Sequence, residues 1–194
     1  GHHVLLLLDS VTRLAMALRE LGLAAGEPPT LRAYPPSVFS ALPRIVERCG
    51  AVRGGGAITA VMTVLAETDD NDDPIAEAMK SLLDGHILLS RTLAERGQFP
   101  AIDVPRSISR LAGDVLPADD LALAREAAGL LSTYEASRMM IEAGVYAAGS
   151  SAELDRAIAL RPALLGFLRQ DGGEQSTREA SRQALSTVLE GTRS

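Results

Sequence analysis

The sequence predicts an α/β protein in its first part and an all-helical arrangement in its second. Two apolar runs, residues 4–8 and 57–65, have the length and composition of strands. A helical apolar pattern lies between them, and strands that alternate with helices are typical of a parallel sheet. Beyond residue 113 every longer apolar pattern has helical spacing. We therefore expect a boundary near residue 115, with an α/β domain over residues 1–115 and a helical domain over residues 116–194.

The composition restricts the class of protein. The 194 residues include 25 acidic and 19 basic side chains, a net charge of −6, without a cluster of Lys and Arg, which disfavours a nucleic-acid partner. Aromatic residues make up 3% of the chain, so the core must be built from Leu, Ala, Val and Ile. No apolar run is long enough to span a bilayer. The single cysteine, Cys49, excludes an internal disulfide and fits a reducing compartment.

Asp9 follows the first predicted strand directly. Five apolar residues in a row, 4–8, predict a strand that is covered on both faces, as in a parallel sheet. Open α/β sheets bind ligands at the carboxyl ends of their strands, and nucleotide-hydrolysing folds place there an acid that holds Mg²⁺. The alternative is that Asp9 caps the next helix. That helix is predicted over residues 11–21 and is expected to end at Gly22 and Gly26.

The segment that follows is rich in proline and glycine. It predicts a loop over residues 27–36 and a helix from Ser37 toward Cys49 that Pro43 kinks or splits. Three glycines at 54–56 lack the Gly-Lys-Ser/Thr ending of a phosphate-binding loop, so we interpret them as a turn.

Beyond the second strand, residues 67–73 hold five acids. They lack the register of a calcium-binding EF-hand and predict a solvated loop. Asp73 and Pro74 then start a helix that runs to about residue 83. A short strand over 86–89 and a helix over 90–96 follow, and His86 is interpreted as a turn anchor.

Capping signals divide the second part of the chain into helices. The first predicted helix covers 119–144, and a capping box at Ser150 and Glu153 opens the second. The third covers 162–170, and a capping box at Ser176 and Glu179 opens the last, which ends near residue 189. Residues 170–173 are expected to form a flexible joint between the last two helices.

An ordered set of short motifs resembles the flagellar and type III secretion export ATPases, which are relatives of the catalytic subunit of the rotary ATP synthases. The motifs are VLLLLDSVTR (4–13), GEPP (26–29), YPPSVF (34–39), LP (42–43), GGG (54–56), DPI (73–75), LDGHI (83–87), LSR (89–91), PAID (100–103) and SISR (107–110). The resemblance is looser in the helical part, where G-x-Y-x-x-G-S (144–150) and LD-x-AI (154–158) still fit. It implies a RecA-like P-loop NTPase sheet, present in part, followed by a helical carboxyl-terminal domain.

The resemblance also implies roles for four residues. Asp9 is similar to the Walker B acid that orients Mg²⁺ through water, and Arg13 matches an arginine near the phosphates. Phe99 lies where the family has an aromatic residue against the adenine. Arg110 resembles the arginine finger that reaches the ATP of a neighbouring subunit, a contact worth roughly 10³ to 10⁵ in rate.

The resemblance also implies a function for the chain. Its members couple ATP hydrolysis in a homo-hexameric ring to protein export through a flagellar or type III secretion apparatus, in the cytoplasm and peripherally at the inner face of the membrane. The implied partners are stalk-like proteins, export-apparatus proteins and exported substrates, and no nucleic acid. Residues 69–73 and 149–153 are the expected docking surfaces for a stalk-like partner.

One family motif does not occur. No Gly-x-x-x-x-Gly-Lys-Ser/Thr sequence is found, so we expect the phosphate-binding loop, the catalytic Glu and the amino-terminal β-barrel to precede residue 1, and the chain to be inactive alone. The alternative is a non-catalytic truncated paralogue that binds a partner or a ring neighbour through its helical half. A nucleic-acid motor is disfavoured by the charge.

Overall fold

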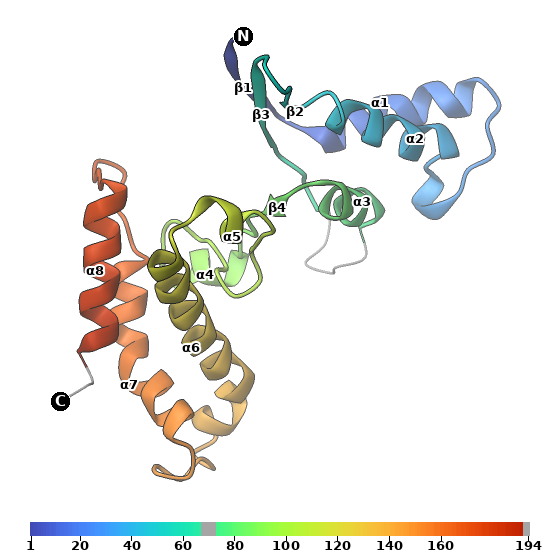
Figure 1. Cartoon of the computed structure of the whole chain (residues 1–194). Helices are drawn as coiled ribbons and strands as arrows, with labels where there is room; N and C mark the ends of the chain where they lie inside the picture. Colours follow the sequence, from blue (N-terminus) through green and yellow to red (C-terminus); the bar gives the residue numbers. More distant parts are fainter. Residues whose placement is uncertain (67–72, 192–194) are drawn as a thin grey trace. The chain divides into compact units, whose positions relative to one another are not determined.

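The structure, a computed structural model, describes residues 1–66 and 73–191. It divides into two compact units, Gly1–Asp84 and Gly85–Ser194, each with its own hydrophobic core. Figure 1 shows strands and helices in the first unit and mainly helices in the second. The predicted α/β class with a helical second part is confirmed. No helix in the described ranges is long and apolar enough to cross a bilayer.

The sheet of the first unit is built around a parallel pair. Strand β1 (His3–Leu8) pairs with β3 (Ala57–Met62) from His3 opposite Ala57 to Leu8 opposite Met62. Strand β2 (Gly50–Ala51) adds to the other edge of β3 in antiparallel orientation, so the strand order is β1-β3-β2. The glycine segment forms the predicted turn between β2 and β3, closed by a 3.0 Å hydrogen bond from Val52 N to Gly56 O.

The expectation that the first strand is covered on both faces is wrong for the described part of the chain. Side chains of residues 4–7 are 37–69% exposed. The helices of this unit bury their apolar stripes against one another, and only the last strand residues, Leu8 and Met62, reach that core. An apolar run therefore predicted the strand, but burial also needs elements that lie on its faces.

Three α-helices carry the core of the first unit. They are α1 (Val11–Ala24), α2 (Pro36–Val46) and α3 (Pro74–Leu82). Their shared core contains Val11, Ala15, Tyr34, Val38, Leu42, Ile75 and Met79. The predicted start of α3 is confirmed, because the Asp73 carboxylate accepts hydrogen bonds from the N–H groups of Ile75 and Ala76 at 2.9 and 3.0 Å.

Two predicted boundaries in this unit need correction. Helix α1 runs through Gly22, where a Cβ would lie 2.7 Å from Pro35 Cγ, so this glycine permits close packing and does not end the helix. Helix α2 begins at Pro36 instead of Ser37 and is not split by Pro43. A proline in a helix costs one hydrogen bond, and here the buried Val38 and Leu42 hold the helix in place.

The loop between α1 and α2 contains a strained turn. Its 3₁₀ helix η1 (Leu31–Ala33) places Arg32 at φ 49° and Ala33 at φ 63°, in the left-handed region. That region costs a residue with a Cβ roughly 1–2 kcal/mol. The buried N-cap Asp73 holds the turn through an ion pair of 3.9 Å with Arg32.

We expect Ala33→Gly to raise the free energy of unfolding by about 0.5–1 kcal/mol, because glycine adopts positive φ without a steric cost. Urea unfolding followed by circular dichroism measures this. The control is Ala17→Gly on the exposed side of α1, which should lower stability by about 0.5–1 kcal/mol. A loss of stability in Ala33→Gly equal to that of the control would contradict the strain argument.

The second unit begins with short elements. Strand β4 (Gly85–His86) pairs antiparallel with β5 (Ile108–Ser109), and Leu89 forms an isolated bridge with Ile102. The strand predicted over 86–89 is therefore shorter than expected. Helices α4 (Arg91–Glu95), predicted over 90–96 and capped by Ser90, and α5 (Ala112–Val115) complete this segment.

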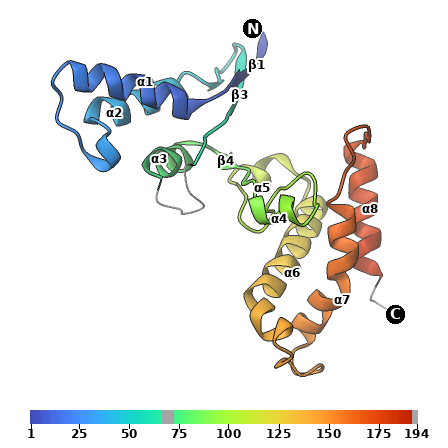
Figure 2. The same cartoon turned by 180° about the vertical axis from the view of Figure 1, so that it is seen from behind.

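Three long helices form the remainder of this unit. They are α6 (Ala118–Glu142), α7 (Ala152–Phe167) and α8 (Arg178–Glu190), which pack side by side (Figures 1 and 2). Their core contains Ala127, Leu130, Leu131, Leu154, Ala157, Leu160, Leu164 and Leu189. Helix α7 is one helix through Pro162, where the sequence predicted two. The buried Leu160 and Leu164 on either side of this proline anchor the helix to the core.

The predicted capping serines are each one residue too early. The N-caps are Ser151 and Thr177, whose hydroxyls accept hydrogen bonds from Leu154 N and Ala180 N at 3.3 and 3.1 Å. Ser150 instead donates to the carbonyl of Ala147 at 2.7 Å. Two adjacent hydroxyl residues at each site made the choice ambiguous in the sequence.

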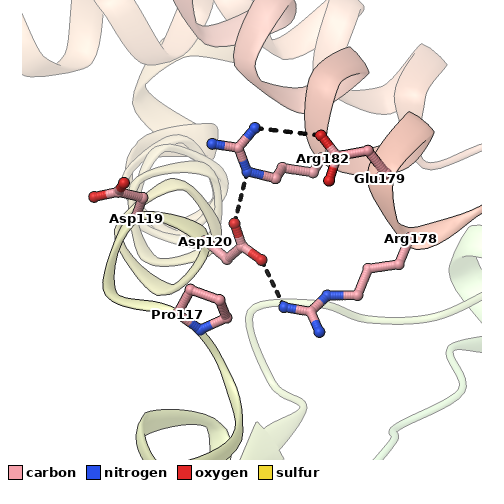
Figure 3. Close-up of a pocket in the computed structure, with 6 residues that line it drawn as sticks. All are labelled: Pro117, Asp119, Asp120, Arg178, Glu179 and Arg182. Carbon is pink, nitrogen blue, oxygen red and sulfur yellow. Dashed lines mark hydrogen bonds and ion pairs between the residues drawn. The ribbon is translucent and has the colours of Figure 1, made fainter.

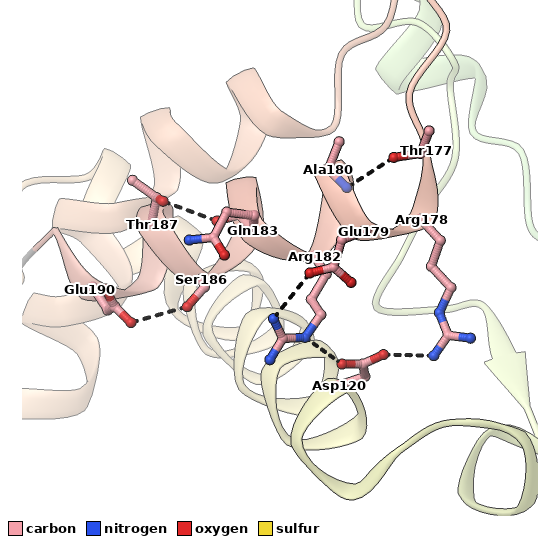
Figure 4. Close-up of polar contacts among 10 residues, drawn as sticks. All are labelled: Asp120, Thr177, Arg178, Glu179, Ala180, Arg182, Gln183, Ser186, Thr187 and Glu190. Atoms are coloured by element: carbon pink, nitrogen blue, oxygen red, sulfur yellow. Dashed lines mark hydrogen bonds and ion pairs between the residues drawn. The ribbon is translucent and has the colours of Figure 1, made fainter.

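Asp120 joins the first turn of α6 to α8. It accepts hydrogen bonds of 2.7 Å from Arg178 Nη2 and from Arg182 Nε, and Arg182 also pairs with Glu179 (Figures 3 and 4). The hydrogen bonds from Arg178 and then Arg182 hold the pKa of the Asp120 carboxyl below its ordinary value of 3.8. A carboxyl with a lowered folded-state pKa stabilises the fold above its unfolded-state pKa, and this contribution is lost as the pH falls through the folded-state value.

We expect Asp120→Asn to lower the melting temperature at pH 7, because both arginines lose a charged acceptor. The difference from the unchanged protein should be smaller at pH 3, which lies below the ordinary pKa of 3.8, because the stabilisation by Asp120 declines between that value and the lowered folded-state pKa. Thermal unfolding at the two pH values measures this. Asp119→Asn is the matched control, since the neighbouring Asp119 is exposed and points away from both arginines (Figure 3). An equal deficit at both pH values would contradict the assignment.

Candidate functional site

The carboxyl edge of the β1–β3 pair presents a polar couple. Asp9 follows β1 and Thr63 follows β3, and the parallel register places the two residues side by side. Thr63 Oγ1 donates a hydrogen bond of 2.6 Å to Asp9 Oδ1. Asp9 is nevertheless exposed, so its carboxylate is oriented by the threonine and accessible to a ligand.

Backbone contacts brace this edge against the start of α1. Val11 N donates to Thr63 O at 2.9 Å, and Thr63 N donates to Leu8 O at 3.0 Å. The cap of α1 is Ser10, whose buried hydroxyl accepts from Arg13 N at 3.3 Å. The alternative reading of Asp9 as the helix cap is therefore wrong, because Ser10 performs that task.

Asp9 can contribute a carboxylate to Mg²⁺ binding, but it cannot hold the ion alone. Its Oδ2 makes no hydrogen bond to any residue in the described ranges. The described residues also contain no group of three His, Cys, Asp or Glu side chains that could hold a metal. Mg²⁺ is usually bound by one or two carboxylates together with water and substrate phosphates. The exposed Asp9 fits that arrangement.

Arg13 lies in the first turn of α1, close in sequence to Asp9, and is exposed. Helix α1 thus carries a guanidinium near the same edge of the sheet. These two predicted site residues belong to the first compact unit.

Phe99 and Arg110 belong to the second unit. The Phe99 ring is 58% exposed, and its carbonyl accepts a 3.0 Å hydrogen bond from Gln170 N, which ties the segment after α7 to this loop. Arg110 follows β5 directly and is exposed. Nearby, His86 Nε2 lies 3.1 Å from Arg106 O, which fits its interpretation as a turn anchor.

Of the two expected docking surfaces, residues 69–72 lie outside the described residues. The other, at the turn between α6 and α7, is organised by Asp155. Its carboxylate accepts hydrogen bonds of 2.9 Å from Tyr146 OH and from Gly149 N. Next to this turn, Met139 and Val145 are 86% and 72% exposed. This end of the helical hairpin is therefore a fixed loop with apolar side chains at its surface.

Sequence reasoning missed Thr63. The signal was present, since a residue that follows one parallel strand lies beside the residue that follows its neighbour. Its use required the register of two strands that are 54 residues apart in the chain.

Comparison with known proteins identifies the class. Residues 1–109 match the family model described as the nucleotide-binding domain of the ATP synthase alpha/beta family. The chain belongs to this family. Residues 116–187 match a second family model, the C-terminal domain of the type III secretion ATPase EscN. Within the larger family, the chain is similar to the carboxyl-terminal part of the flagellar and type III secretion ATPases.

Individual relatives agree with both matches. The chain is 51% identical over 192 residues to a flagellum-specific ATP synthase of Pseudomonas aeruginosa, covering 98% of this chain and 43% of the relative. A type 3 secretion system ATPase of Xanthomonas euvesicatoria is 46% identical, with 98% and 43% covered. The chain thus spans less than half the length of these relatives.

Solved structures show the same likeness. The assembled ATPase EscN of enteropathogenic E. coli superimposes with a TM-score of 0.90 at 44% identity, over 96% of this chain and 45% of EscN. The structure of EscN with its central stalk EscO gives a TM-score of 0.83 at 42% identity, over 96% and 44%.

Proposed function

We propose that this chain is part of an ATPase that couples ATP hydrolysis to protein export through a flagellar or type III secretion apparatus. The observation that carries the proposal is the exposed Asp9, held by Thr63 at the carboxyl edge of a parallel strand pair in a chain of the nucleotide-binding family. Ligands of α/β sheets bind at this edge.

The four predicted residues take distinct roles in this proposal. Asp9 orients Mg²⁺ and its bound water, and Arg13 lies near the phosphates of ATP. Phe99 stacks on the adenine, for which its exposed ring is suited. Arg110 reaches the ATP held by a neighbouring subunit of a homo-hexameric ring. Mg²⁺, when bound, neutralises charge on the phosphates.

The proposal extends to partners and location. We infer a cytoplasmic protein, peripheral at the inner face of the membrane, that contacts a stalk-like protein, the export apparatus and exported substrates. The solved complex of EscN with its central stalk supports a stalk-like partner. We also propose a domain boundary near residue 115, which the two family matches support because they meet between residues 109 and 116.

The test uses the protein that carries this chain together with the parts present in its relatives. Phosphate release is measured with Mg²⁺ and ATP, and assembly by native mass spectrometry. We expect hydrolysis by a six-subunit ring. A ring that assembles but hydrolyses no ATP would contradict the proposed ATPase activity and favour the non-catalytic, partner-binding alternative.

We expect Phe99→Ala to weaken ATP affinity by about 10-fold, since loss of base stacking costs roughly 1–3 kcal/mol. The rate at saturating ATP should change less than about threefold, because the ring does not contact the phosphates. Titration of a fluorescent ATP analogue and steady-state hydrolysis measure the two effects. Phe99→Tyr, which keeps an aromatic face, should bind ATP normally. Unchanged affinity in Phe99→Ala would show that the ring serves only packing.

A further inference from the structure

The second unit contains a pocket that none of the proposed site residues lines. It has a volume of about 300 Å³ and lies between the segment of residues 90–106 and helices α6 and α7. Its floor is apolar, with Leu131, Leu165 and Leu168. Its walls carry more guanidinium groups than carboxylates, since Arg96, Arg106, Arg138 and Arg161 line it with Asp103 and Glu135.

Arg161 is held in place but retains its hydrogen-bond donors. Its guanidinium carbon lies 4.2 Å from the centre of the Tyr134 ring, which orients the group. Its nearest carboxylate oxygen, on Glu135, is 3.6 Å away, which is too long for a hydrogen bond. Within the described part of the chain it makes no hydrogen bond. A planar group with five donors is thus presented to the pocket.

Arg138 and Arg96 add positive charge. Arg138 donates from Nε to Glu142 at 2.7 Å, whereas its Nη1 is 3.6 Å from Glu135. Arg96 is exposed and lies within 4 Å of no carboxylate among the residues described. These side chains come from α6 and from the end of α4, so the charge surrounds the pocket on more than one side.

Gln98 adds an uncharged polar group to the pocket. It lines the pocket and is only 4% exposed. Its side-chain amide makes no hydrogen bond to any residue in the ranges described. No buried side-chain nitrogen or oxygen among the described residues lacks a partner, so the unpaired amide of Gln98 is accessible, and the pocket that it lines is where a ligand can reach it. A peptide group, with one donor and one acceptor, is the natural complement of this amide.

We propose that this pocket binds the carboxyl terminus of a partner polypeptide that ends in an apolar residue. The terminal carboxylate pairs with the guanidinium groups of Arg161 and Arg138. The last side chain lies on the leucine floor, and Gln98 exchanges hydrogen bonds with the last peptide group. A chain end fits better than a chain that passes through, because the volume is at the lower limit of ligand pockets. The inference is independent of ATP hydrolysis.

The test compares two fluorescein-labelled pentapeptides, Gly-Ser-Gly-Ala-Leu with a free carboxylate and the same peptide as a carboxamide. Fluorescence polarisation with the 194-residue chain should give a Kd on the order of 10⁻⁴ M for the acid. The carboxamide should bind at least about tenfold more weakly, because it lacks the charge.

Variants of the chain locate the site. Arg161→Gln and Gln98→Leu should each weaken binding of the acid by about 5- to 10-fold. Arg125→Gln is the control, since Arg125 is exposed on α6 outside the pocket. Equal binding of acid and carboxamide, absence of binding at millimolar concentration, or full binding by Arg161→Gln would each overturn the proposal. A carboxamide peptide ending in Glu-Leu that binds as well as the acid would do the same, in favour of an internal carboxylate.

Discussion

Arg110→Ala is expected to lower ATP hydrolysis by the assembled ring about 10³-fold or more, while ATP still binds. The expectation rests on the proposed function. An arginine finger neutralises charge that develops on the transferred phosphate, so its loss affects the transition state and leaves substrate binding intact. Arg110 is exposed immediately after β5, where a short antiparallel pair fixes its backbone.

The measurement is phosphate release at saturating ATP together with a binding titration. Arg110→Lys should also be strongly impaired, because an ammonium cannot replace the two-pronged guanidinium contact. Arg169→Ala, which removes an exposed arginine from the end of α7, is the control for loss of charge. Turnover in Arg110→Ala within about threefold of the unchanged ring would contradict the finger assignment.

Mixed rings test whether the finger acts between subunits. Subunits with Arg110→Ala retain Asp9, and subunits with Asp9→Asn retain Arg110. In a ring that contains both in equal amounts, about a quarter of the interfaces combine an intact Asp9 with an intact Arg110 from the neighbour, so activity should return in part. No recovery would indicate that the two residues serve the same site from one subunit.

The strength of local signals decided what the sequence could predict. The Asp73-Pro74 start of α3 was predicted correctly, because it depends on a side chain and the backbone two or three residues away. The same reasoning chose the wrong cap where two hydroxyl residues are adjacent, as at Ser150 and Ser151. Both can cap, and only the packing of α7 selects one.

Tertiary contacts determined the features that local sequence signals did not predict. Pro162 predicted a helix break, but Leu160 and Leu164 bury on the same core and hold α7 together. The apolar run of β1 predicted a strand correctly, but what lies on a strand's faces is not encoded in its own residues. Asp9 could be singled out from the sequence as a candidate site residue, whereas Thr63, which orients it, depends on strand register.

Asp9→Asn is expected to lower Mg²⁺-dependent ATP hydrolysis by at least about 10²-fold, because a neutral amide binds a hard divalent cation more weakly than a carboxylate does. The substitution is nearly isosteric, and the amide oxygen can still accept the 2.6 Å hydrogen bond from Thr63. The loss should therefore come from charge and not from misfolding, which an unchanged melting temperature would verify.

Two further variants separate charge from orientation at this position. Thr63→Val keeps the Asp9 carboxylate but removes its hydrogen bond, so we expect a smaller loss of about 3- to 10-fold, with a raised Mg²⁺ requirement. Glu20→Gln, an exposed carboxylate on the same α1 helix, should have no effect. If Asp9→Asn hydrolysed ATP at the unchanged rate across a Mg²⁺ titration, this result would contradict the proposed role of Asp9 in Mg²⁺ binding. The family membership would still stand, because it rests on the whole sequence.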